Sequence, residues 1–158
     1  MRAVTLIDAA LLDATSSKAR ASARLRMNQN FHLSEAEPAN RLLNAVEPGS
    51  YVTPHRHLDP AKDETFVVVR GRFGLVCFDE SGAVTLTQVL EPNGEVVGAN
   101  VPHGTFHTLL SIVPGSVFFE AKAGPYVKTS DKDWAPWAPR EGDPGAAAYL
   151  AKLEALFR

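Results

Sequence analysis

The stretch that decides the fold is His55-Arg56-His57-Leu58-Asp59-Pro60-Ala61-Lys62-Asp63-Glu64-Thr65-Phe66-Val67-Val68-Val69-Arg70-Gly71. In a β-strand, side chains two positions apart point to the same face. His55 and His57 therefore share a face of one predicted strand, and Glu64 and Phe66 share a face of the next. Two histidines and a glutamate in a barrel interior would be costly to bury without a partner, and a metal ion is a partner that suits them.

The surrounding sequence, from residue 40 to residue 122, consists of short β-rich runs separated by turn residues such as Pro48-Gly49, Ser81-Gly82 and Pro114-Gly115. Many short strands at even spacing predict an antiparallel barrel or sandwich rather than a βαβ fold. The predicted strands are residues 41–46, 51–57, 65–70, 73–78, 84–90, 96–101, 107–112 and 117–122.

The two ends of the chain differ from this β-rich region. Residues 4–26 begin with a helical pattern, with Thr5 or Asp8 as a possible N-cap, and lead into the polar and aromatic run 28–32, which has no strand periodicity. Residues 126–143 contain both tryptophans among prolines and charged residues, and are expected to wrap the barrel as an irregular segment.

A closing helix is predicted over residues 146–156, after Pro144 or Gly145. We expect one domain over residues 1–158, because single hydrophobic cores are usually built from about 100 to 150 residues. Its parts are an N-terminal helix and polar arm (1–39), the barrel (40–124), and a wrapping tail with a helix (125–158).

Composition narrows the class of partner. Apolar residues make up 45% of the chain and charged residues 22%, as in an ordinary soluble globular protein. The net charge of −2 provides no positive field to gather phosphates, so neither nucleic acid nor a membrane surface is expected as a partner. A glycine-rich phosphate loop is also absent, so we expect a small-molecule ligand.

The location predicted from the sequence is the cytoplasm. Cys77 is the single cysteine, so no intramolecular disulfide is possible. Residues 1–12 lack the apolar core and cleavage site of a signal peptide, and no run approaches the roughly 20 apolar residues that span a bilayer.

A fourth candidate ligand is His107, which opens a later predicted strand after the turn 102–106. With His55, His57 and Glu64 it makes a set of three imidazoles and one carboxylate, which suits a divalent Zn, Fe, Ni or Mn ion. Four such ligands leave one or two positions open on an octahedral ion, as a catalytic metal requires. His103, in the same turn, is expected to face solvent.

These motifs resemble those of the cupin superfamily. Gly49, five residues, His55-Arg56-His57, then Glu64, six residues and Gly71 resemble its first motif, and Pro102-His103-Gly104-Thr105-Phe106-His107 resembles its second. The resemblance implies a double-stranded β-helix, a jelly-roll barrel, with the three histidines and the glutamate on the metal. It also implies a homodimer, since cupins commonly pair. The chain departs from the pattern in the six residues between His57 and Glu64, where three or four are usual.

A closer resemblance is to the WbuC-type cupin-fold metalloproteins of bacterial surface-polysaccharide gene clusters, and it covers nearly the whole chain. It implies a metal and a link to sugar metabolism. The stretches that carry it are Arg26-Met27-Asn28-Gln29-Asn30-Phe31-His32, Asn40-Arg41-Leu42-Leu43-Asn44-Ala45-Val46-Glu47-Pro48, residues 63–74, residues 118–126 and Asp133-Trp134-Ala135-Pro136-Trp137-Ala138-Pro139.

A second group of residues is predicted to surround the ligand. Glu120, if it points inward, is a candidate general base, and His32 is a second candidate for proton transfer. The candidate substrate-binding residues are Asn28, Asn30, Arg41, Tyr51, Thr53 and Ser111, since amides suit hydroxyl groups and a guanidinium suits a carboxylate or phosphate. Each also has a purely structural interpretation: a loop-binding arm, a surface charge or ordinary packing.

Three functions remain open at this point. The first is a metal-dependent isomerase or epimerase acting on a small polar metabolite, such as a sugar or nucleotide-sugar derivative, with the ion as Lewis acid. The second is an iron-dependent dioxygenase, since the same ligands suit Fe(II). The third is a non-catalytic sugar-binding or regulatory module, because cupins host all these roles and fold alone does not decide among them.

Overall fold

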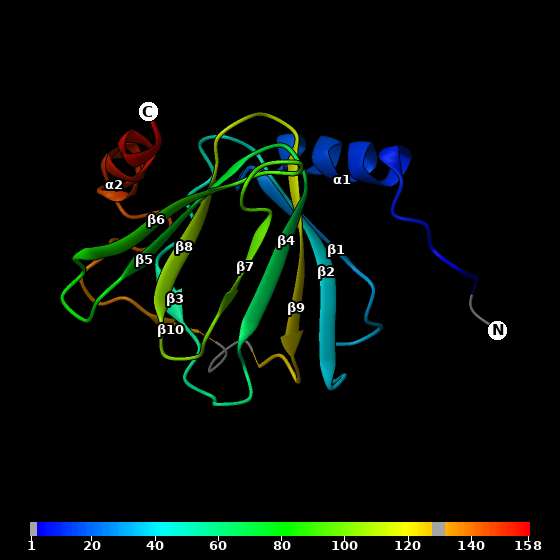
Figure 1. Ribbon diagram of the computed structural model, residues 1–158, viewed down its shortest axis with the longest axis horizontal. Helices are drawn as coiled ribbons and strands as arrows, with labels where there is room; N and C mark the ends of the chain where they lie inside the picture. Colours follow the sequence, from blue (N-terminus) through cyan, green and yellow to red (C-terminus); the bar gives the residue numbers. More distant parts are fainter. Residues whose placement is uncertain (1–2, 128–131) are drawn as a thin grey trace.

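Two antiparallel sheets form the body of the computed structural model, which describes residues 3–127 and 132–158 (Figure 1). Within the described residues one sheet has the order β1-β2-β9-β4-β7 and the other β10-β3-β8-β5-β6. The strands are β1 (Arg26–Asn30), β2 (Ala39–Val46), β3 (His55–Arg56), β4 (Glu64–Arg70), β5 (Phe73–Phe78), β6 (Val84–Leu90), β7 (Gly98–Val101), β8 (Phe106–Ser111), β9 (Ser116–Ala123) and β10 (Asp133–Trp134). This arrangement confirms the predicted mainly β, antiparallel jelly-roll barrel.

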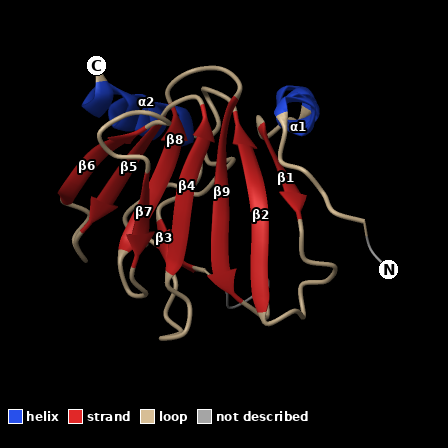
Figure 2. Cartoon of the chain, turned by 45° about the vertical axis from the view of Figure 1, so that its right-hand side comes forward, coloured by secondary structure: helices blue, strands red, loops and turns tan. Residues whose placement is uncertain are grey.

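A helix lies at each end of the chain, as predicted. Helix α1 (Ala9–Ala21) begins at Asp8, whose side chain accepts a hydrogen bond from the backbone N–H of Leu11 at 2.9 Å. Helix α2 (Ala146–Glu154) is followed by the short 3-10 helix η1 (Ala155–Phe157). Figures 1 and 2 show both helices at one end of the barrel, away from β3.

Two predicted boundaries were wrong. The polar run that starts at Asn28 is not an irregular arm but belongs to β1, which pairs with β2 so that Asn28 lies opposite Asn44. Its polar side chains gave no apolar alternation from which a strand could be predicted. Of the predicted strand 51–57, only His55–Arg56 pairs with neighbouring strands, because Pro54 has no N–H to donate to a neighbouring strand.

The tail wraps the second sheet but is more regular than predicted. Strand β10 pairs with β3, with Trp134 opposite His55, and helix α2 then packs on the outer face of the sheet. Residues 128–131 of the predicted tail, like residues 1–2 of the predicted N-terminal part, lie outside the described residues.

The apolar core fills only part of the barrel. Between the sheets, Phe66, Phe73 and Phe118 pack edge to face, with ring centroids 5.8 and 5.1 Å apart. Two further clusters lie outside the sheets, one under α1 and one under the tail and α2. Burying each large apolar side chain stabilises the fold by roughly 1.5–3 kcal/mol. The rest of the interior is lined by both apolar and polar side chains.

Gly71, which follows β4, has a φ of +79°, and a Cβ there would lie 2.6 Å from the Cα of Ser116. Only glycine therefore fits this turn.

No helix in the described parts of the chain has the length and apolar character needed to cross a bilayer.

A cluster of charges ties the tail to β1. Arg24 donates two hydrogen bonds to the Glu141 carboxylate, at 2.9 and 2.7 Å, and Arg26 donates a third at 2.7 Å. The hydrogen bonds from Arg24, aided by those from Arg26, lower the pKa of Glu141 to about 2. The backbone N–H of Glu141 also donates to the Thr53 hydroxyl at 2.9 Å. Glu141 therefore holds the tail against the barrel.

We expect Glu141→Gln to lower the free energy of unfolding by about 1 kcal/mol at pH 7, because a charge-assisted pair that is partly exposed is screened by solvent. A depressed pKa stabilises the fold above the ordinary carboxyl value of 4.5, and this contribution is lost as the pH falls toward about 2. Urea titrations of the two proteins between pH 7 and pH 2 measure the difference. Glu91→Gln is the matched control, because it removes the carboxylate that pairs with Arg72 at an exposed position. It should change the free energy of unfolding little. A wild-type advantage that does not shrink in acid would contradict this account.

Candidate metal centre

Two histidines face each other across neighbouring strands of the second sheet. His55 on β3 lies directly opposite His107 on β8, and their ring centroids are 4.8 Å apart. His57 follows two residues after His55, and its backbone carbonyl accepts a hydrogen bond from Gly104 at 2.7 Å. That bond fixes the turn before His107 against the loop after β3, so the two predicted motifs meet in space.

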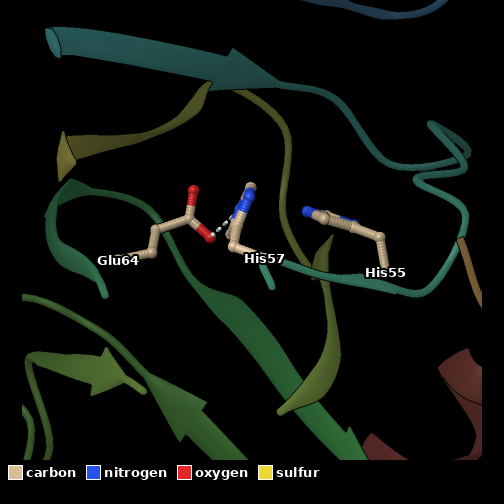
Figure 3. Close-up of side chains that lie close together, drawn as sticks. All are labelled: His55, His57 and Glu64. Atoms are coloured by element: carbon tan, nitrogen blue, oxygen red, sulfur yellow. Dashed lines mark ion pairs between the residues drawn. The ribbon is translucent and has the colours of Figure 1, made fainter. Parts of the chain in front are cut away.

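The carboxylate comes from the opposite sheet. Glu64 is the first residue of β4, and its Oε2 lies 2.9 Å from Nε2 of His107 and 3.4 Å from Nε2 of His57. Figure 3 shows Glu64 and His57 pointing toward one another, with the ring of His55 directed at the same space. Ligand atoms of His55, His57 and Glu64 all lie within 4.8 Å of one another. The longer loop between His57 and Glu64 therefore does not prevent the contact.

The backbone orients two of the imidazoles. Nδ1 of His55 lies 3.1 Å from the carbonyl oxygen of Thr53, and Nδ1 of His107 lies 2.9 Å from that of Thr105. A carbonyl oxygen can only accept, so each Nδ1 carries the proton and donates it. In the neutral ring Nε2 then presents a lone pair, which is the form that binds a metal.

The short contact between His107 and Glu64 shows that this site fits a cation. With Nδ1–H already donated, Nε2 of neutral His107 and Oε2 of ionised Glu64 are both acceptors, yet they lie 2.9 Å apart. A second proton or a metal ion must lie between them. Two ligands about 2.1 Å from one ion are about 3.0 Å apart in an octahedron and about 3.4 Å apart in a tetrahedron. The distances from Oε2 of Glu64 to Nε2 of His107, 2.9 Å, and to Nε2 of His57, 3.4 Å, fall close to this range.

Burial determines the charge of these groups. It lowers the pKa of His55 well below 6.5, with help from the nearby positive charge of Lys132, so the ring is neutral at physiological pH. Burial alone would raise the pKa of Glu64, but the close approach of His107 and His57 outweighs it and lowers that pKa well below 4.5. The site therefore combines the neutral imidazole of His55 with an ionised carboxylate.

A second carboxyl group lies beside this cluster. Glu120 on β9 is largely buried next to Glu64, with its side chain 13% exposed, and this burial together with the Glu64 charge raises the pKa of Glu120 to about 8. Its Oε2 accepts a hydrogen bond from Asn44 at 2.9 Å, and its Oε1 lies 3.9 Å from Nζ of Lys122. Glu120 can therefore carry a proton at neutral pH while Glu64 stays ionised.

The cluster borders a cavity of about 1050 Å3 between the sheets. The register places Lys122 and Asn40 in one row with Glu64, and Glu120 and Leu42 in the next row with Phe66. Four asparagines, Asn28 and Asn30 on β1 and Asn40 and Asn44 on β2, line the same cavity. The buried Oδ1 of Asn40 has no hydrogen-bond partner among the described residues. This wall therefore offers amide groups to a bound molecule.

Five of the eight other predicted site residues line the cavity: Asn28, Asn30, His32, Thr53 and Glu120. Nδ1 of His32 lies 3.1 Å from both the backbone N and the backbone O of Arg41, so the peptide of Arg41 orients that ring.

The structure does not bring the other three to the cavity. The Arg41 side chain points away from it and lies 3.4 Å from the Glu37 carboxylate, because the inward positions of β2 are Asn40 and Leu42. Tyr51 is packed in the apolar cluster under the tail and α2, where its hydroxyl donates to the carbonyl of Pro139 at 2.7 Å. Ser111 donates to the carbonyl of Val113 at 2.9 Å, in the turn after β8.

Several lining residues were not predicted from the sequence, among them Asn40, Asn44, Lys122 and Arg140. The signal for the first two was present, because Asn40, Leu42, Asn44 and Val46 alternate along β2, with polar residues at inward positions. Arg140 comes from the tail and gave no such signal. His103 is exposed and bonded to Asp63 at 2.9 Å, outside the cluster.

Solved structures with the same fold include three that the chain resembles at low identity. KdgF from a Halomonas species is 18% identical with a TM-score of 0.51, over 66% of this chain and 82% of KdgF. Oxalate decarboxylase from Bacillus subtilis is 16% identical with a TM-score of 0.52, over 69% of this chain and 27% of the decarboxylase. The capsular polysaccharide assembling protein CapF from Staphylococcus aureus is 15% identical with a TM-score of 0.57, over 72% of this chain and 32% of CapF.

These likenesses show that the fold is that of the cupins. The chain spans about a third or less of the length of oxalate decarboxylase and of CapF, but most of KdgF. A comparison with curated protein sequences found no match. The model of the family described as a domain of unknown function, DUF6016, matches residues 7–90, which is more than half of the chain, and the chain therefore belongs to that family.

Proposed function

We propose that this protein is a mononuclear divalent-metal cupin that acts on a small hydroxylated metabolite, with the ion held by His55, His57, Glu64 and His107. The observation that carries the proposal is the 2.9 Å contact between Nε2 of His107 and Oε2 of Glu64. Both atoms are acceptors when the ring is neutral and the carboxylate is ionised, so either a proton or a metal ion between them would account for the contact. The buried cluster of His55, His57 and Glu64 beside it supports the metal ion. Imidazole and carboxylate together suit Zn, Fe, Ni or Mn.

The reaction that fits best is isomerisation or epimerisation of a sugar or nucleotide-sugar derivative. A bound divalent ion would supply Lewis acidity toward a carbonyl or a pair of hydroxyls. Glu120 is the candidate for proton transfer, because its carboxyl group faces the cavity beside Glu64 and its Oε2 is fixed by Asn44. His32 lines the same cavity and is the second candidate.

The amide wall supports a hydroxylated ligand. Each of Asn28, Asn30, Asn40 and Asn44 can both donate and accept, as a ring of hydroxyl groups requires. The Oδ1 of Asn40 is buried without a partner in the described part of the chain, and an unsatisfied buried acceptor costs about 1–3 kcal/mol. A ligand hydroxyl that donates to this oxygen would recover that free energy.

The narrower assignments belong to the same proposal. The sequence resemblance to WbuC-type cupins supports a role in surface-polysaccharide biosynthesis, and CapF, which shares the fold, is itself a capsular polysaccharide assembling protein. We further propose a homodimer located in the cytoplasm, from the pairing of cupins and from the single, buried Cys77. A non-catalytic sugar-binding module is the second candidate, because the amide wall could bind a ligand without any proton transfer.

Protein purified without chelator or histidine tag should contain about one equivalent of a transition metal. His57→Ala and His107→Ala should each lose it, because they remove a ligand, whereas His103→Ala should keep it. Elemental analysis, with circular dichroism to verify folding, measures this. Iron in the sample would favour oxygen-activating chemistry over isomerisation. Full metal content in both ligand variants would refute the site.

The Co(II)-substituted protein should change its visible spectrum when a panel of hexoses and deoxyhexoses is added, because an open coordination position is accessible to ligand. Asn30→Ala should weaken the best binder by about tenfold, which is about 1.4 kcal/mol for one lost hydrogen bond. Asn100→Ala is the matched control, since Asn100 is exposed and bonded to Thr65. A Co(II) spectrum that no sugar alters would instead favour a closed, structural metal. Equal losses of affinity in the Asn30 and Asn100 variants would contradict the proposal that the cavity asparagines bind the ligand.

A further inference from the structure

Trp134 lies beside the candidate metal centre in the lining of the cavity. It lies directly opposite His55 in the β10–β3 pair, and the indole and imidazole centroids are 5.6 Å apart. Its side chain lines the cavity and is 36% exposed. A molecule bound against Trp134 would therefore lie close to His55.

Two cationic side chains lie against this one ring. Cζ of Arg140 is 5.0 Å from the Trp134 ring centroid, and Nζ of Lys132 is 5.5 Å from it. Both residues line the cavity. An indole face attracts a cation, but two like charges near one ring also repel each other, and an anion bound nearby would relieve that repulsion.

The charges that line the cavity show where an anion would go. The cations are Arg24, Arg26, Lys122, Lys132 and Arg140, and the carboxylates are Glu35, Glu64, Glu120 and Glu141. Glu141 binds Arg24 and Arg26, Glu120 faces Lys122, and Glu64 lies within the histidine cluster. Arg140 forms no ion pair with any carboxylate among the residues the structure describes, although a guanidinium presents a fork of donors matched to one.

We infer that Trp134, Arg140 and Lys132 form an anion subsite at the mouth of the cavity, so that the natural ligand carries a carboxylate or phosphate group beside its hydroxyls. This inference deepens the proposed function and rests on the same cavity. The anionic group binds at Arg140 and Lys132, while the hydroxyl-bearing part reaches the amide wall. Neutral sugars of the same shape lack the group that these cations recognise.

The test is a titration of 15N-labelled protein with sodium acetate and, separately, with inorganic phosphate, at constant ionic strength so that general screening does not change. The indole N–H signal of Trp134, assigned with Trp134→Phe, is followed. It should shift and saturate, while the signal of Trp137, which packs against Phe78 and Phe106, should stay in place. Whichever anion saturates at the lower concentration identifies the group as carboxylate or phosphate.

Variants distinguish a built subsite from a general surface charge. Arg140→Ala should weaken anion binding by about tenfold, Arg140→Lys by less, and Lys132→Ala by an intermediate amount, since the bidentate fork is the main contact. Arg72→Ala, which removes an exposed arginine paired with Glu91 outside the cavity, should leave binding unchanged. A linear shift that never saturates, or equal effects of Arg140→Ala and Arg72→Ala, would overturn the inference.

The titration is run on the protein as purified and after removal of metal. Saturable binding in both states supports the subsite even if the elemental analysis finds no metal. One equivalent of metal in a protein whose Trp134 signal does not respond would overturn the subsite and leave the metal centre standing. The two proposals therefore fail separately.

Discussion

The contact between Glu64 and His107 joins the two sheets at the polar end of the barrel, and the arrangement of the cavity depends on it. Glu64 begins β4 in one sheet and His107 lies on β8 in the other, so the contact fixes the distance between the sheets there. The four candidate ligand residues are each no more than 5% exposed. Burying them is costly unless a cation pairs with them, and this ties the stability of this end of the fold to the ion proposed for it.

The barrel interior contains both the apolar side chains that stabilise the fold and the polar side chains of the candidate site. The same strands that carry Glu64 and Glu120 also carry Phe66 and Phe118, in each case two positions away and therefore on the same inward face. Burial and the charge of Glu64 raise the pKa of Glu120 to about 8, while Glu64, next to the histidines, is ionised.

Local sequence patterns predicted the part of the site that depends on strand alternation, and missed the part that depends on long-range pairing. His55, His57 and Glu64 could be placed on inward faces because a period of two is visible in a few residues. The role of β1 could not be predicted in this way, because Asn28 and Asn30 become strand residues only by pairing with β2. Tyr51 shares the predicted period with His55 but packs outward, because the chain before Pro54 is not held in a ladder.

The tail completes the cavity without belonging to the barrel. Glu141 ties it to β1 through Arg24 and Arg26, and β10 ties it to β3, so the segment between them is held at both ends. Trp134, which lies opposite His55, and Arg140, which lies against the Trp134 ring, are on this held segment. A rigid support of this kind lets Arg140 keep a fixed position relative to the candidate metal ligands, which recognition of a charged group requires. The tail could therefore vary the small molecule that is recognised while the barrel keeps the candidate metal-binding residues.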